Sequence, residues 1–144
     1  MEYKRGDRVE VIDSEEGFEG SYYGAVIVTK LNGDEYIVTY DTLLKEDLSG
    51  PLREVVEADN LRPKPPPPEG DQPTRYRLYQ SVDVFHNDGW WVGRIIGKIG
   101  SVYNVFFDST QEELPYGVEA LRIHQDWVDG TWVTPAVKKL EIKS

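Results

Sequence analysis

The stretch that decides the fold consists of three blocks: Lys4-Arg-Gly-Asp-Arg-Val-Glu-Val11, Gly20-Ser-Tyr-Tyr-Gly-Ala-Val-Ile27 and Tyr36-Ile-Val-Thr-Tyr-Asp41. Each block is short and rich in valine or tyrosine, residue types that favour strands. Turn-forming segments such as Asn32-Gly-Asp34 separate them, and long 3.6-residue periodicity is absent from the chain. The pattern predicts short β-strands joined by turns.

The same blocks return in the second half of the chain. Their counterparts, in the same order, are Tyr79-Gln-Ser-Val-Asp-Val84, Gly89-Trp-Trp-Val-Gly-Arg-Ile-Ile96 and Tyr103-Asn-Val-Phe-Phe-Asp108. A fourth block, Asn60-Leu-Arg62, is matched by Ala120-Leu-Arg122. An internal repeat of this kind predicts two copies of one small unit, each a meander of four or five strands. Because a unit of this size buries little surface alone, we expect the two to pack together.

A proline-rich segment separates the two copies. The run Pro65–Pro68 should form a stiff polyproline II stretch. Such a run serves either as a spacer or as a docking motif, and its position between similar halves favours the spacer. We predict a first domain over residues 1–63, a linker over 64–76, and a second domain over 77–144 that carries a C-terminal extension with two tryptophans.

The composition favours a cationic partner and excludes several classes of protein. The formal charge is −10, from 26 acidic and 16 basic side chains, and a field of this sign repels phosphate backbones and attracts basic peptides. There is no cysteine, and the two histidines, His86 and His124, lack metal-ligand spacing. No catalytic motif is present. We therefore expect no cofactor, no metal and no enzymatic activity.

Four sequence blocks carry a resemblance to a known family. Gly-Asp-Arg-Val-Glu-Val, Gly-Phe-Glu-Gly-Ser-Tyr-Tyr-Gly-Ala-Val and Tyr-Ile-Val-Thr-Tyr-Asp, closing on Asp59-Asn-Leu-Arg-Pro63, resemble Agenet domains of the Tudor-like Royal superfamily, over about residues 3–123. The two copies and the tail His-Gln-Asp-Trp-Val-Asp-Gly-Thr-Trp are similar to plant Agenet proteins that read heterochromatic histone marks. The resemblance implies an all-β fold of two tandem Tudor-like (SH3-like) five-stranded β-barrels. It also implies a nuclear chromatin protein of gene silencing that binds dimethyl- or trimethyl-lysine on the histone H3 tail.

The resemblance places an aromatic cage in the first domain. In Tudor-like barrels the cage is formed by the loop before the second strand, the start of that strand and the end of the third. The residues at these places are Phe18, Tyr22, Tyr23 and Tyr40, with Asp47 at the rim. A methylated ammonium keeps its charge but loses hydrogen-bond donors, so ring faces suit it. Strand alternation puts Tyr22 and Tyr23 on opposite faces, so one of the two joins the cage, and we favour Tyr23. The alternative is that these rings belong to the core.

Acidic residues concentrate in the first domain. Residues 1–62 carry 15 acidic and 7 basic side chains, against 9 and 6 in residues 79–144. The first domain is therefore expected to attract the peptide more strongly, and a carboxylate near the cage could accept the N–H of dimethyl-lysine. The expected peptide contacts are Glu15, Glu16, Glu19, Asp41 and Glu46. A solvated surface role is the alternative for each of them.

The second repeat departs from the cage pattern. Val92 stands opposite Tyr23, and the loop opposite Phe18 shortens to residues 86–89. Three large aromatic residues remain there, Trp90, Trp91 and Phe107. They form either a secondary surface for the peptide or structural packing, and we favour packing.

Two other functions stay open. The barrels could bind a partner protein without reading methylation. They could also stack nucleic-acid bases on exposed rings, but the net charge and the lack of a basic stripe disfavour this.

Overall fold

A computed structural model describes residues 2–13, 20–66 and 76–135. In these ranges the regular structure is β, apart from two single-turn 3-10 helices. The chain divides into two compact units: residues 1–65 with 87–90, and residues 66–86 with 91–144. In the described part of the chain, no helix is long and apolar enough to cross a membrane. The predicted all-β architecture is confirmed.

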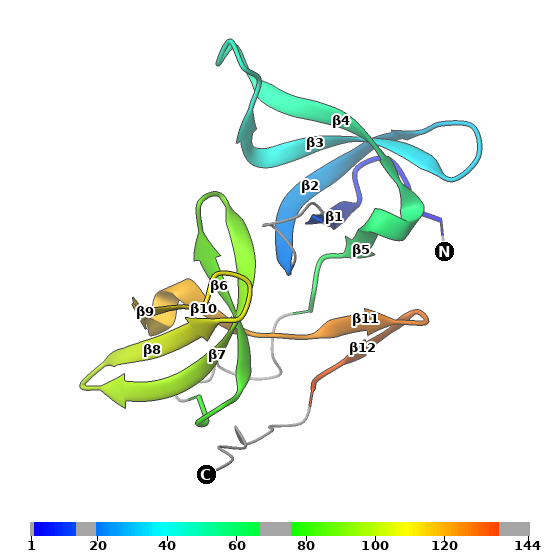
Figure 1. The fold of residues 1–144 in the computed structure, drawn as a ribbon. Coiled ribbons are helices and arrows are strands. Elements are labelled where there is room, and N and C mark those ends of the chain that lie inside the picture. Colours follow the sequence, from blue (N-terminus) through cyan, green and yellow to red (C-terminus); the bar gives the residue numbers. More distant parts are fainter. Residues whose placement is uncertain (1, 14–19, 67–75, 136–144) are drawn as a thin grey trace. The chain divides into compact units, whose positions relative to one another are not determined.

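The first unit is a row of five strands (Figure 1). Its elements are β1 (Arg8–Asp13), β2 (Ser21–Lys30), β3 (Glu35–Leu44), β4 (Pro51–Glu57), the 3-10 helix η1 (Ala58–Asn60) and β5 (Leu61–Pro63). The strands hydrogen-bond in the order β5-β1-β2-β3-β4, and every pair is antiparallel. Both long strands, β2 and β3, overlap sequence blocks for which a strand was predicted.

The second unit repeats this plan element by element. It holds β6 (Ser81–His86), most of β7 (Gly89–Ile99), β8 (Val102–Phe107), β9 (Glu112–Gly117), η2 (Val118–Ala120) and β10 (Leu121–Ile123). The order β10-β6-β7-β8-β9 is that of the first unit. A separate hairpin follows, β11 (Asp126–Val128) and β12 (Thr131–Val133), whose turn contains Asp129 and Gly130 at positive φ.

The strands of each unit do not close into the expected barrel. Among the described strands, β4 pairs with β3 alone, and β5 pairs with β1 alone. A single turn, η1, separates these two edge strands in the sequence, and it turns the chain away from β4 and onto β1. The prediction of five strands per unit is confirmed, but the ring of backbone hydrogen bonds is open between the fourth strand and the fifth.

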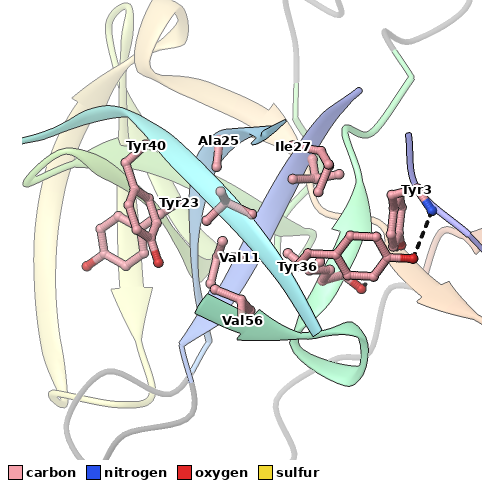
Figure 2. Packing of buried hydrophobic residues seen from close by; sticks show 11 residues of the cluster. Tyr3, Val11, Tyr23, Ala25, Ile27, Tyr36, Tyr40 and Val56 are labelled. Carbon is pink, nitrogen blue, oxygen red and sulfur yellow. Dashed lines mark hydrogen bonds between the residues drawn. The ribbon is translucent and has the colours of Figure 1, made fainter. Parts of the chain in front are cut away.

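A repeated pair of tyrosines closes one end of each core. The backbone N–H of Tyr3 donates to the hydroxyl of Tyr36 (3.2 Å), and their rings meet edge to face, as Figure 2 shows. Tyr76 and Tyr103 repeat both contacts in the second unit, with a hydrogen bond of 3.1 Å. Tyr76, which the sequence analysis assigned to the linker, therefore lies buried in the second core.

A largely buried ion pair joins the first and fifth strands of each unit, β1 with β5 and β6 with β10. Glu10 and Arg62 are register partners on β1 and β5, and the guanidinium donates from Nε (3.0 Å) and Nη2 (2.7 Å) to Oε1. Both side chains are almost fully buried. In the second unit, the register partners Asp83 and Arg122 repeat the pair at 2.8 Å.

The second unit adds a histidine to this pair. His124 contacts Asp83 through Nδ1 (2.7 Å) and Asp126, on β11, through Nε2 (2.8 Å). Burial alone would lower the pKa of His124, but the two carboxylates outweigh it and raise that pKa above its ordinary value. The side chain of His124 thereby links the C-terminal hairpin to β6.

Replacing Glu10 by alanine should strongly destabilise the first unit. Arg62 would keep its charge in a buried position without its partner, which typically costs about 3–5 kcal/mol. Chemical denaturation followed by circular dichroism, with amide signals of β1 and β5 observed by NMR, measures the effect. Lys30→Ala, which removes the exposed ion pair with Glu2, is the matched control and should change stability little. If the two variants were equally stable, the Glu10–Arg62 pair would not have the stabilising role described for it.

The second unit should lose stability as the pH rises above about 6.5, the ordinary pKa of histidine. The pKa of His124 is raised by folding, so protonation stabilises the folded state. That contribution is fully present below the unfolded pKa, about 6.5, and is lost as the pH rises through the higher folded pKa. NMR titration of the imidazole and denaturation at several pH values measure it. In Asp126→Asn the folded pKa should fall and the pH dependence should shrink. If the stability of the wild type did not depend on pH, protonation of His124 would not stabilise the second unit.

Candidate functional site

A cavity of about 620 Å³ lies in the first unit, along the edge of β4. It is bounded by the end of β1, the start of β2, the second half of β3, β4 and the last residue of η1. The lining residues are Val11, Ile12, Asp13, Tyr23, Tyr40, Leu43, Glu54, Val55, Val56, Glu57 and Asn60. The cavity therefore occupies the place where the strands leave the barrel open.

Two tyrosines meet in this cavity. Tyr23 lies opposite Val11 in the β1–β2 register, and Tyr40 lies opposite Ala25 in the β2–β3 register. Figure 2 shows the two rings side by side at one end of the core, with Tyr36 at the other end. Both side chains are largely buried but line the hollow. They belong to the core and to the cavity at once.

Three carboxylates share the cavity with the two tyrosines. Tyr40 donates to Oε2 of Glu54 (2.8 Å). Burial first, and then this hydrogen bond, raise the pKa of Tyr40, and burial raises that of Tyr23. The charge of Asp13 acts on both tyrosines, and Glu57 lines the same space. The cavity thus presents neutral, electron-rich rings beside three acidic side chains, a combination that suits a weakly hydrated cation.

Strand alternation separates the two neighbouring tyrosines, as expected. Tyr22 lies opposite Ile12 and not in the cavity, and the guanidinium carbon of Arg62 lies 3.5 Å from the centre of its ring. Tyr22 therefore covers the buried Glu10–Arg62 pair, while Tyr23 lines the cavity. Tyr23, the one favoured for the cage, is thus the tyrosine that lines the cavity, and its role in a cage stays a prediction.

The other predicted acidic residues of the first unit lie away from the cavity lining. Asp41 is exposed and forms an ion pair with Arg8 at 3.5 Å. Asp47 accepts the backbone N–H of Ser49 (2.9 Å) in the turn after β3, and Glu46 beside it is exposed. The remaining predicted contacts fall outside the described residues: Phe18, Glu15, Glu16 and Glu19.

The acids that do line the cavity were missed by the sequence analysis. The acids predicted from the sequence are adjacent in the chain to the aromatic residues, whereas Glu54 reaches Tyr40 from the neighbouring strand, opposite Val38. Asp13 and Glu57 end β1 and β4. Period-two alternation in residues 52–56 could have placed Glu54 on the same face as Val56, but the pairing of strands was needed to bring it to Tyr40.

The second unit has a different set of residues at the equivalent positions. The matching registers put Phe107 in the place of Tyr40 and Leu114 in the place of Glu54. His86 replaces Asp13 and Gly117 replaces Glu57. Tyr116 packs edge to face against both Phe107 and His86 in the same region. Ring packing and apolar side chains thus take the place of the carboxylates that line the first unit's cavity.

The predicted secondary aromatic surface is mainly structural. Phe107 is buried in the second core and not at the surface, because β8 turns it inward with Tyr103 and Val105. Trp91 is half-buried, packs against the same core and donates its Nε1–H to the carbonyl of His86 (2.7 Å). Trp90 is half-buried as well. Packing, the favoured alternative, accounts for Phe107 and Trp91.

No group of three or more metal-binding side chains is found among residues 2–13, 20–66 and 76–135. What the described site offers is a binding surface made of rings and carboxylates.

Comparison with known proteins gives one family for both units. The sequence model of the Agenet domain matches residues 6–66 and 80–137. Protein AGENET DOMAIN (AGD)-CONTAINING P1 of Arabidopsis thaliana is 40% identical over 135 residues, which covers 92% of this chain and 25% of that protein. DUF724 domain-containing protein 3 of the same plant is 35% identical, with 91% and 19% covered. The chain thus spans a quarter or less of these two relatives.

Solved structures agree with the sequence comparison. The crystal structure of AGD34 of Arabidopsis thaliana AGDP1 superimposes with a TM-score of 0.84 at 36% identity, covering 92% of this chain and 90% of that one. The crystal structure of the tandem Agenet domain 3-4 of ADCP1 gives a TM-score of 0.80 at 33% identity, with 93% and 89% covered. The match extends over both units.

Proposed function

This chain belongs to the Agenet domain family, and from that premise we propose that it is a chromatin reader whose first unit binds a methylated lysine on a histone tail. The observation that carries the proposal is the cavity in which Tyr23 and Tyr40 lie beside Asp13, Glu54 and Glu57. Agenet domains are peptide- and protein-binding modules, and the tandem pair fits such a role.

The two rings supply preference for a methylated cation. Each ring face attracts a weakly hydrated ammonium by about 0.5–2 kcal/mol, whereas an unmodified lysine has to lose a tightly held water shell. Two rings in one hollow are enough for about a tenfold preference. Phe18 is proposed as a third ring, on the sequence pattern alone.

The three carboxylates supply preference for a lower methylation state. Dimethyl-lysine keeps one N–H, which a carboxylate can accept, whereas trimethyl-lysine has none. Glu54 is already oriented by Tyr40 and has a second carboxylate oxygen for the ligand. We therefore favour dimethyl-lysine, and on the family resemblance the ninth lysine of histone H3, as the mark, which implies a nuclear, heterochromatic location.

The charge of the first unit suits the rest of such a tail. The excess of acids over bases in residues 1–62 favours a partner rich in lysine and arginine and disfavours nucleic acid. Asp41, Glu46 and Asp47 follow Tyr40 in sequence and are proposed as longer-range contacts for the basic residues of the tail.

Calorimetric titration with histone H3 tail peptides bearing zero to three methyl groups on the ninth lysine tests the proposal. Wild type should bind the dimethyl peptide about tenfold more tightly than the unmodified peptide. Tyr23→Ala and Tyr40→Ala should lose most of this difference, because each removes a ring face from the cavity.

Phe85→Ala is the matched control, since it removes a partly exposed ring from β6 in the second unit. It should keep the methylation preference. Circular dichroism verifies that all variants are folded. Equal wild-type affinity for methylated and unmodified peptides would contradict the reader and favour a methylation-independent protein-binding scaffold.

A further inference from the structure

The cavity lies along a strand edge that has backbone hydrogen-bonding capacity left. We propose that the peptide carrying the methylated lysine binds in extended form and adds as a strand to the outer edge of β4, through the backbone of Val55 and Glu57. This inference rests on the proposed function for its ligand. It concerns a different part of the surface, the backbone edge instead of the rings.

The register of β3 and β4 determines which backbone groups point outward. The N–H of Ala58 donates to the carbonyl of Asp34 (2.7 Å), which continues the β3–β4 register by one residue. In an antiparallel pair, hydrogen-bonded residues alternate with residues whose N–H and C=O point away. Glu54 and Val56 therefore bond to β3. The N–H and C=O groups of Val55 and the N–H of Glu57 point to the opposite side, while the C=O of Glu57 begins the 3-10 turn of η1.

The opposite side is where the cavity lies. Among the described strands, β4 has β3 as its sole partner. Four consecutive residues of β4, from Glu54 to Glu57, line the cavity. A lysine side chain in the cavity would therefore bring its own backbone alongside this edge. An edge with N–H and C=O groups at alternate positions is the feature that extended peptides use in strand addition.

In the second unit, the strand edge lacks a backbone N–H at the position equivalent to Val55. In β9 the residue equivalent to Val55 is Pro115, because Tyr116 and Leu114 match Val56 and Glu54 in register. Proline has no N–H, so within a sheet it occupies edge positions and prevents further pairing. The two units thus differ in their rings, in their carboxylates and in their edges, and in each respect the first is the one suited to a peptide.

The occupant is a basic, extended peptide. Glu54 and Glu57 stand on the strand that it would follow, and Asp13 faces them from β1. The side chain of Val55 is about half exposed (54%) on the outer face of β4, where it can pack against an alternate side chain of the added strand.

Proline substitution on β4 tests the inference. Val55→Pro removes one outward N–H without removing a bond to β3, and Pro115 shows that this fold accepts proline there. Val55→Ala is the matched control, which loses the side chain but keeps the N–H. The proline variant should bind a dimethyl-lysine peptide about three- to tenfold more weakly than the alanine variant, the effect of one backbone hydrogen bond.

A second pair of variants keeps the inference testable if Val55→Pro does not fold. Glu57 has φ −74°, within the range of proline, so Glu57→Pro should fold. Compared with Glu57→Ala it should show the same three- to tenfold loss, because both lack the carboxylate and differ in the N–H. Hydrogen exchange on wild type gives a further readout: peptide should slow exchange of the Val55 and Glu57 amides.

A capped dimethyl-lysine without flanking residues separates the two proposals. Observed by NMR, it should bind the proline and alanine variants of each pair equally, because it needs the cavity alone. If proline and alanine variants also bind the full peptide equally, and the two amides gain no protection, strand addition is overturned while the cavity proposal stands. If wild type binds neither ligand, both proposals are overturned.

Discussion

The buried ion pair between the first and last strands is the constraint on which each unit depends. β5 has three residues, too few to be held by backbone pairing alone. Arg62, opposite Glu10 and covered by Tyr22, fixes it on β1. Removing two charges from water is costly, and the cost is offset only when both are close and well hydrogen-bonded. The short contacts between the guanidinium and the carboxylate meet that condition.

This constraint also decides where the cavity lies. With β5 held on β1, the fourth strand is left with one partner, and the row of strands stays open beside it. The core extends to this opening. Tyr23 and Tyr40 therefore pack against the core on one side and line the cavity on the other. The proposed reader function needs rings that are rigid and yet accessible, and rings at the end of a core satisfy both needs. Alternation on β2 then assigns its two tyrosines to different tasks, Tyr22 to the ion pair and Tyr23 to the cavity.

The two units show how one frame can carry different side chains at the same open edge. The tyrosine pair at the far end of the core and the ion pair between first and last strands are present in both. The differences concentrate at the open edge, where leucine replaces Glu54, phenylalanine replaces Tyr40 and proline replaces Val55. The second unit instead uses His124 to hold the C-terminal hairpin. The frame is thus separable from the binding surface that it supports.

The sequence by itself determined the repeat, the all-β class, the five strands of each unit and the separation of Tyr22 from Tyr23. These follow from local pattern: turn residues, strand-forming residue types and the period of two along a strand. The tertiary structure alone decided that Glu54, and not Asp47, stands beside Tyr40, and that the barrel is open at β4. It also decided that Phe107 is core and that Arg62 is buried. Those outcomes depend on which strands pair and in what register, and register brings together residues far apart in the chain, which no local pattern encodes.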